Sequence, residues 1–193
     1  MITLTEHLRD KIQLGFTVNK TVSDKIILFD LDDTIIHTTA KISVFKNGNC
    51  IKKLSNSEFN DYILRPGESF GFEEFSDFDI LSKSEFTPYW NTLQREYKKG
   101  THVGILTARE NCDMIKKFFL NNGIRIKDEL IMAINDPSLG LSGTIQQRKS
   151  EAISILANAG YKLFIFFDDN EPNLKSAKKL EKEYNIKVQT VKV

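Results

Sequence analysis

The sequence has 193 residues, of which 27 are Lys or Arg and 26 are Asp or Glu, so the formal net charge is +1 at pH 7. A chain of this length fits one domain with a substantial core, and its balanced charge excludes a global attraction to nucleic acid or to an anionic membrane. No apolar run approaches the ~20 residues of a membrane span, so we expect no membrane association.

Two features predict a cytoplasmic protein. The first ten residues contain scattered polar side chains and no uninterrupted apolar segment, which argues against a signal peptide. The two cysteines, Cys50 and Cys112, have neither the spacing of a disulfide framework nor that of a metal site. The simplest interpretation is a reduced intracellular chain.

Residues 25–29 form an apolar strand that leads directly into the carboxylates of Asp30, Asp32 and Asp33. Side chains alternate along a strand, so Asp30 and Asp32 point the same way if the chain stays extended. Two neighbouring carboxylates repel each other unless a cation, a shared proton or hydrogen-bond donors offset the repulsion. An isolated pair of this kind is more often a turn or a cap, but here it predicts a metal or acid–base site.

Residues 35–85 interrupt the pattern of the rest of the chain, and we expect them to form a small inserted cap. Residues 41–45 and 50–54 flank an Asn-Gly pair at positions 47 and 48, which is a strong hairpin signal. Aromatic side chains follow, and they predict a small separate core, an apolar wall that contacts substrate, or both. These side chains are Phe59, Tyr62, Phe70, Phe72, Phe75, Phe78, Phe86, Tyr89 and Trp90.

After residue 85, helical and extended patterns alternate. We expect helices over residues 87–100, 110–122 and 147–159 and from Pro172 onward, and strands at 102–107, 130–134, 162–167 and 186–193. This order predicts a single α/β domain over residues 1–193, with a mainly parallel sheet between two helical layers, in a Rossmann-like three-layer sandwich.

Ligands of open parallel sheets bind at the carboxyl ends of the strands. Several polar side chains are expected at this edge, and they are Asp30, Asp32, Thr107, Lys149, Asp168 and Asp169. Carboxylates suit Mg²⁺, a hard cation that prefers oxygen ligands, whereas a hydroxyl and an ammonium group suit phosphoryl oxygens. This combination of groups predicts phosphate chemistry.

Four segments share their order and their placement at strand ends with the motifs of a known family. They are residues 30–34, residues 105–109, Lys149 and residues 167–173. In these motifs the chain resembles the haloacid dehalogenase superfamily of aspartate-nucleophile phosphatases, over residues 24–193. The resemblance implies a Mg²⁺-dependent phosphatase that hydrolyses phosphomonoesters through an aspartyl-phosphate intermediate.

The resemblance also implies roles for individual residues. Asp30 would be the nucleophile and a metal ligand, and Asp32 would be the general acid and base, with its main-chain carbonyl on the metal. Thr107 and Lys149 would bind and neutralise the phosphoryl group, and Thr107 could also be the N-cap of the next helix. Ala108 and Arg109 complete the second motif as substrate-binding residues, although Arg109 could instead be a solvated residue in the first turn of that helix.

The fourth motif supplies the remaining metal-site residues that the resemblance implies. We favour Asp169 as the direct ligand, while Asp168 would hydrogen-bond metal-bound water or Lys149. Thr34 and Asn173 would support the site.

Within this interpretation, the substrate is a phosphorylated small molecule, such as a nucleotide, or a nucleic-acid 3′-phosphate end. A short insertion leaves the cleft open enough for either class. The alternative is a non-catalytic regulatory module that binds phosphate and Mg²⁺. The sequence gives no indication of an obligate protein partner.

Overall fold

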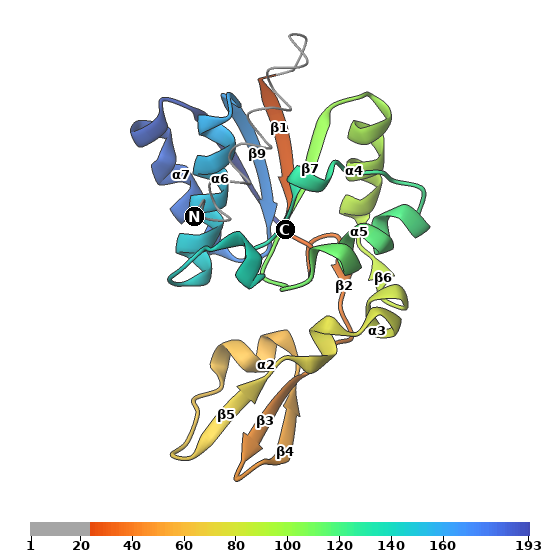
Figure 1. Ribbon diagram of the computed structural model, residues 1–193, viewed down its shortest axis with the longest axis vertical. Helices are drawn as coiled ribbons and strands as arrows, with labels where there is room; N and C mark the ends of the chain where they lie inside the picture. The colour runs from red at the N-terminus through yellow and green to blue at the C-terminus, as the bar shows by residue number, and fades with distance from the viewer. Residues whose placement is uncertain (1–23) are drawn as a thin grey trace.

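The computed structural model describes residues 24–193, so the expected absence of a signal peptide lies outside the described residues (Figure 1). A five-stranded sheet has the order β10-β9-β1-β7-β8, and every neighbouring pair in it is parallel. Its strands are β1 (Lys25–Phe29), β7 (His102–Thr107), β8 (Ile131–Ala133), β9 (Leu163–Asp168) and β10 (Lys187–Lys192). The mixed α/β architecture with helices flanking a parallel sheet is thus present, as expected for a Rossmann-like fold.

Four helices cover the two faces of this sheet, and Figure 1 shows α4 and α5 on one side and α6 and α7 on the other. Their bounds are α4 (Pro88–Lys98), α5 (Cys112–Asn121), α6 (Ile145–Asn158) and α7 (Glu171–Tyr184). Right-handed crossovers explain this division, because the chain moves from β1 outward to β8 and then returns across the sheet to β9 and β10. Short 3₁₀ turns lie at Glu73–Ser76, Asp128–Leu130 and Pro137–Leu139.

Two helix starts differ from the sequence-based expectation. Asn111 is the N-cap of α5 and accepts a hydrogen bond from the N–H of Met114, so the prediction that Thr107 could cap this helix is wrong. Residues 108–111 separate the end of β7 from the first residue of α5, so Thr107 lies too far from the helix to cap it. Thr144 begins α6 with a capping box to Gln147, which places Lys149 in the second turn.

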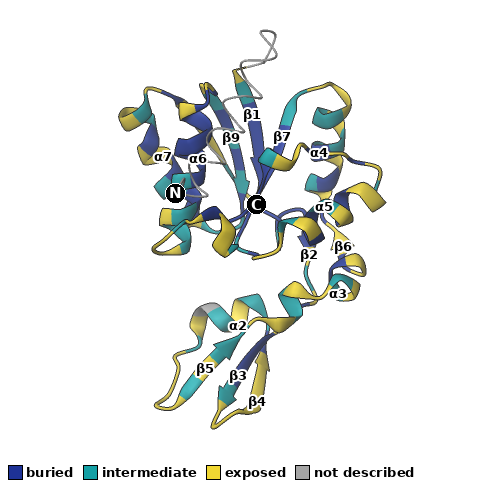
Figure 2. Ribbon diagram, viewed as in Figure 1, coloured by how far each residue is buried: buried dark blue, intermediate teal, exposed yellow. Residues whose placement is uncertain are grey.

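The main core lies on both faces of the parallel sheet. Ile26, Ile27, Leu28 and Phe29 of β1 are at most 3 % exposed, because β1 is central and covered by helices on each side. Figure 2 shows buried residues along β1 and along the inward faces of the helices. Among residues 24–193, no helix has the length and apolar character needed to cross a bilayer.

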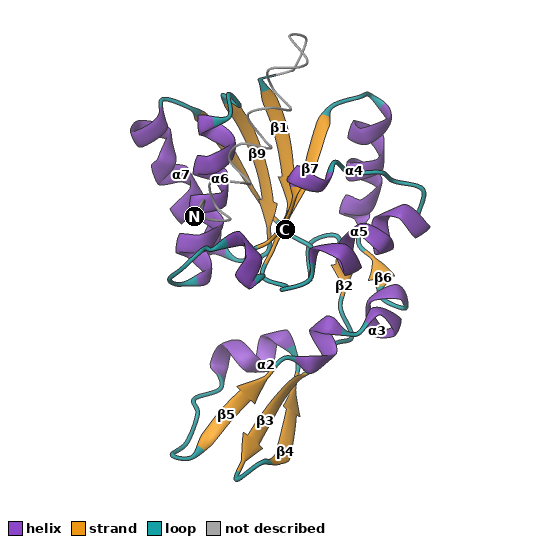
Figure 3. Ribbon diagram, in the orientation of Figure 1, coloured by secondary structure: helices purple, strands orange, loops and turns teal. Residues whose placement is uncertain are grey.

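The segment between β1 and α4 forms a second, smaller sheet with the antiparallel order β4-β3-β5 (Figure 3). Its strands are β3 (Ile42–Lys46), β4 (Asn49–Leu54) and β5 (Glu68–Gly71), with α2 (Asn56–Asp61) following β4. Asn47 and Gly48 both have positive φ values, which suits the tight turn between β3 and β4.

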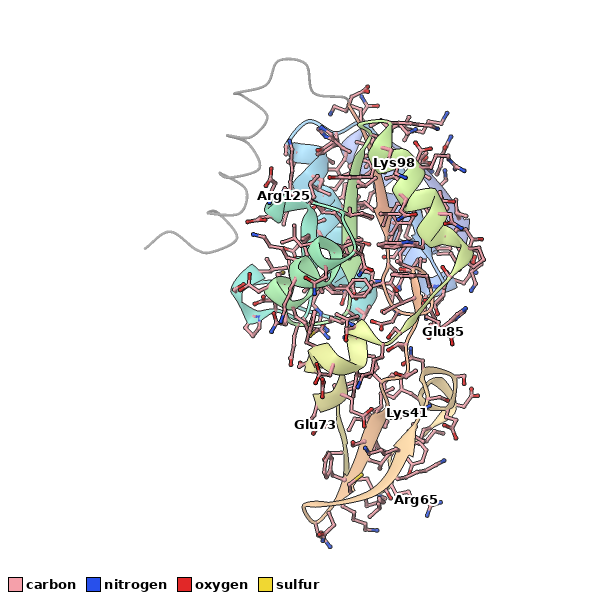
Figure 4. The ribbon with its side chains drawn as sticks, turned by 90° about the vertical axis from the view of Figure 1, so that its right-hand side faces the viewer. Lys41, Arg65, Glu73, Glu85, Lys98 and Arg125 are labelled. Atoms are coloured by element: carbon pink, nitrogen blue, oxygen red, sulfur yellow. The ribbon has the colours of Figure 1, made fainter. Side chains whose placement is uncertain are left out.

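A short antiparallel pair, β2 (Ile36–His37) with β6 (Glu85–Phe86), joins this segment to the rest of the chain, and α3 (Phe78–Ser82) precedes β6. Residues 38–84, between β2 and β6, are called the inserted segment below. Figure 4 shows Lys41 near the junction with the larger sheet and Arg65 farther from it. The inserted segment is therefore attached at one end only.

The aromatic side chains of residues 59–90 do not form one separate core. Some of them pack around Ile42, Val44 and Leu54 in a small core of the inserted segment; these are Phe59, Tyr62, Phe70 and Phe75. Others pack against the main core, and these are Phe78, Tyr89 and Trp90. The expected small separate core is therefore formed only by the first group, because the chain returns to the main sheet before residue 90.

Candidate active site

The carboxyl ends of three strands bring polar residues from distant parts of the sequence to one edge of the sheet. Asp30 follows β1, Thr107 ends β7, and Asp168 and Asp169 come at the end of β9. The main-chain N–H of Asp30 donates to the carbonyl of Phe167 at 2.9 Å, which continues the pairing of β1 with β9 into the site. A cavity of about 430 Å³ opens at this edge, and every predicted site residue except Asp168 and Thr34 lines it.

Lys149 lies between two of the carboxylates. Its Nζ is 2.7 Å from Oδ2 of Asp168 and 3.1 Å from Oδ1 of Asp30, and its side chain is 2 % exposed. Burial opposes the charged form of this lysine, but the two carboxylates and their hydrogen bonds outweigh it and raise the pKa of Lys149. Lys149 is therefore a buried ammonium ion that lines the cavity and contacts the carboxylate of Asp30.

Negative charge at the site exceeds what Lys149 neutralises. Burial raises the pKa of Asp30 well above its ordinary value, and although Lys149 lowers it, Asp168, Asp32 and Asp169 add to the increase. Burial, followed by the charge of Asp168, likewise raises the pKa of Asp169. Such an excess is what a bound divalent cation would compensate.

The side chains of Asp30, Asp168 and Asp169 offer carboxylate oxygens that lie within 4.8 Å of one another. A donor set made only of oxygen atoms fits Mg²⁺. The expectation for Asp32 concerned its main-chain carbonyl rather than its side chain, and it stays a prediction.

Asp168 differs from Asp30 and Asp169 because both of its carboxylate oxygens already accept hydrogen bonds from protein groups. Oδ2 accepts from Lys149, and Oδ1 accepts from the main-chain N–H of Asn170 at 2.8 Å and from Nδ2 of Asn173 at 2.9 Å. The expected hydrogen bond between Asp168 and Lys149 is thus present, and Asn173 supports it. This arrangement leaves Asp169, which lines the cavity, better placed to be the direct ligand.

The expectations for the two threonines have different outcomes. Thr107 is fully buried at the cavity, and its Oγ1 accepts a hydrogen bond from the N–H of Arg109 at 3.3 Å, so its own hydroxyl hydrogen is available to a ligand. Thr34 is also fully buried, but its Oγ1 has no partner among the described residues. Its main-chain carbonyl accepts from the hydroxyl of Thr87 at the start of α4.

Arg109 forms a contact that neither of the two expectations for it included. Its Nε and Nη2 donate to the two carboxylate oxygens of Asp32 at 2.9 and 2.8 Å, and its Nη1 donates to the carbonyl of Phe75 at 2.6 Å. The residue is only 3 % exposed, so the expectation of a solvated residue is wrong. The guanidinium is buried because it pairs with a carboxylate and spans the gap to the inserted segment.

Sequence reasoning assigned no role to Asp33 and did not single out Asn56. Asp33 has a φ of 57°, and its Oδ2 accepts from Nδ2 of Asn56 at 2.6 Å. Asn56 also lines the cavity. The third carboxylate after β1 therefore connects the parallel sheet to the inserted segment.

Comparisons of the chain with protein-family models, with curated proteins and with solved structures found no match. The residues of the site and their geometry are therefore the basis for inferring its function.

Proposed function

We propose that the protein is a Mg²⁺-dependent phosphatase of the haloacid dehalogenase type, which hydrolyses phosphomonoesters through an aspartyl phosphate on Asp30. The observation that carries the proposal is the position of Asp30, whose carboxylate borders the cavity and lies 3.1 Å from the ammonium group of Lys149. A carboxylate nucleophile, a buried cation and further carboxylates then meet at a single opening. Phosphoryl transfer requires that such charges converge, because its transition state carries charge on several oxygens.

The carboxylates of Asp30 and Asp169, with the main-chain carbonyl of Asp32, would hold Mg²⁺. When bound, the ion neutralises phosphoryl oxygens and orients them for attack. Asp168 would act indirectly, by holding Lys149.

In the first step, a carboxylate oxygen of Asp30 attacks phosphorus, and the bond from phosphorus to the leaving oxygen breaks. Asp32 gives its proton to that oxygen, while Lys149 and the hydroxyl of Thr107 donate to phosphoryl oxygens. In the second step, water attacks phosphorus and gives a proton to Asp32. The bond between Asp30 and phosphorus breaks, which releases inorganic phosphate and restores both carboxyl groups.

The inserted segment would act as a small cap over this chemistry. It contributes residues 42, 56, 59, 72, 75 and 76 to the lining of the cavity that contains Asp30. A cap of this kind leaves room for a nucleotide or for the end of a nucleic acid.

The test is phosphate release from a panel of phosphomonoesters with and without Mg²⁺, using the wild-type protein and Asp30→Asn. Loss of the nucleophile is expected to lower kcat by at least ~10³-fold. An Asp61→Asn variant, altered on an exposed residue of α2, is the matched control and keeps its activity. Full activity of Asp30→Asn would show that the nucleophile is wrong. Binding of phosphate and Mg²⁺ without turnover of any ester would instead support the non-catalytic module.

A further inference from the structure

The cavity has two chemically different parts. The parallel sheet and its loops supply the charged part described above, whereas the inserted segment supplies an apolar part. The apolar part is formed by Ile42, Phe59, Phe72 and Phe75, with Asn56 and Ser76 beside them. Under the proposed function the phosphoryl group occupies the charged part, so its leaving group faces the apolar part.

Phe72 is the most exposed aromatic ring of this wall, at 48 %. Its ring lies 5.7 Å from Phe59 at an interplanar angle of 82° and 6.2 Å from Phe75 at 63°. Edge-to-face contacts of this kind hold a ring in place while leaving part of its surface free. An exposed ring that is held in this way at a cavity is preorganised for binding.

Arg109 determines where this wall lies relative to the reacting groups. Its guanidinium carbon is 5.3 Å from the centre of the Phe75 ring, and its Nη1 donates to the carbonyl of the same residue. The other side of the guanidinium holds Asp32. The aromatic wall is consequently positioned against the general acid, on the side where the leaving group of a phosphomonoester must lie.

Polar groups beside the wall distinguish between possible aromatic leaving groups. Asn56 and Ser76 of the inserted segment line the same cavity as the phenylalanine rings. A leaving group with hydroxyl or amino groups can form hydrogen bonds with such polar side chains, whereas a purely apolar leaving group cannot. A nucleoside carries such donors on its sugar and base, whereas the phenyl ring of a phosphotyrosine has none.

We propose that the aromatic wall is a base-binding subsite and that the substrates are nucleoside monophosphates, with the base against Phe72. This inference rests on the proposed phosphatase function. The cavity, at about 430 Å³, is within the size range of sites for small ligands.

The test compares kcat/KM for adenosine 5′-monophosphate with that for ribose 5-phosphate, which is the same sugar phosphate without the base. Stacking of one base on an aromatic ring predicts a preference for the nucleotide of between about fivefold and a hundredfold. Phe72→Ala is expected to remove most of this preference, and Phe72→Tyr to keep it. Ile63→Ala, at a residue of the inserted segment that is 87 % exposed and outside the cavity, is the matched control and leaves the preference unchanged.

Equal kcat/KM values for the two substrates in the wild-type protein, or a preference that Phe72→Ala does not alter, would overturn the subsite. Faster turnover of a phosphotyrosine peptide or of a 3′-phosphorylated oligonucleotide than of the mononucleotide would overturn the assignment of nucleoside monophosphates as the substrates.

Binding of the same two compounds to the wild-type protein, measured by calorimetry, distinguishes failure of the phosphatase proposal from failure of the base-binding subsite. If no ester is hydrolysed, the phosphatase proposal fails. Tighter binding of the nucleotide than of ribose 5-phosphate, lost in Phe72→Ala, would still support the subsite.

Discussion

The carboxylate of Asp32 is held by two nitrogens of Arg109, at 2.9 and 2.8 Å. The two residues are 77 positions apart, and the same guanidinium donates to the carbonyl of Phe75 in the inserted segment. The residue proposed as general acid and base is therefore connected to the cap through one side chain. Each carboxylate oxygen of Asp32 accepts one of these two hydrogen bonds, which leaves a second lone pair on each oxygen for the proton that the leaving group takes.

Removing this guanidinium is expected to destabilise the fold. Arg109→Met leaves the carboxylate of Asp32 without its partner, and breaking a buried ion pair in this way costs about 3 kcal/mol or more. Denaturant unfolding measures the loss. Lys53→Met breaks the exposed ion pair with Glu74 in the same segment and is the control that shows no measurable change. Equal stability of the wild-type protein and Arg109→Met would contradict the structural role of this pair.

A second variant tests how the negative charge of the site is compensated. Lys149→Met leaves Asp30 and Asp168 facing each other without the buried ammonium, so we expect the free energy of unfolding to fall by about 3–5 kcal/mol in the absence of divalent ions. The measurement is denaturant unfolding in chelator. Lys175→Met, which breaks the exposed pair with Glu171 on α7, should unfold like the wild-type protein. A fully stable Lys149→Met variant would show that the carboxylates do not depend on this lysine.

Adding and removing Mg²⁺ should change the thermal stability. A cation that binds only the folded protein stabilises it by about 2.7 kcal/mol at a concentration of 100 times Kd, which corresponds to a Tm increase of roughly 5–10 °C for a chain of this size. Chelator reverses the increase, and Asp169→Asn removes most of it, whereas Asp61→Asn retains it. A Tm that does not respond to Mg²⁺ in the wild-type protein would count against the metal site.

The contact between Asp33 and Asn56 predicts how firmly the inserted segment is held. Asn56→Asp replaces a hydrogen bond of 2.6 Å with the repulsion of two carboxylates, so amide hydrogen exchange in β3, β4 and α2 should become faster. Exchange in β1 and β9 serves as the internal control, because these strands belong to the main core. Unchanged exchange in the inserted segment would mean that other contacts, such as that of Arg109 with Phe75, are sufficient to hold it.

The pH dependence of stability should show a contribution from His102 at the opposite end of β7. Its Nδ1 lies 2.6 Å from the hydroxyl of Tyr161, and burial, followed by the charge of Lys127, lowers the pKa of His102 below its ordinary value of 6.5. The unfolded chain therefore binds this proton more readily than the folded protein does. The stabilisation is present above pH 6.5 and is lost as the pH falls through the lower pKa of the folded state.

Unfolding free energies of the wild-type protein and His102→Gln, measured from about pH 7 to about pH 5, test this expectation. The wild-type protein should lose more stability than the variant over this range. Parallel curves would show that His102 contributes nothing to the pH dependence.

Much of the fold was predictable because it depends on local patterns. The apolar run of β1, the proline-containing starts of α4 and α7, and the alternation of strands with helices are properties of short stretches of chain. Parallel strands connected by right-handed crossovers end at the same edge, so the meeting of Asp30, Thr107 and Asp169 follows from their positions at the carboxyl ends of β1, β7 and β9. The division of the aromatic residues between two cores depends on the path of the inserted segment, which no local pattern specifies.

The sequence by itself determined which strand-end residues reach the site, because the carboxyl ends of parallel strands meet at one edge of the sheet. Only the tertiary structure decided which carboxylate each cation serves: Lys149 pairs with Asp30 and Asp168, and Arg109 pairs with Asp32. Several carboxylates and two cations are expected at the same edge of the sheet, and which of them pair depends on where the loops and helices that carry them lie. Those positions are set by packing across the whole molecule, and therefore the connection from Asp32 through Arg109 to the aromatic wall emerges only in three dimensions.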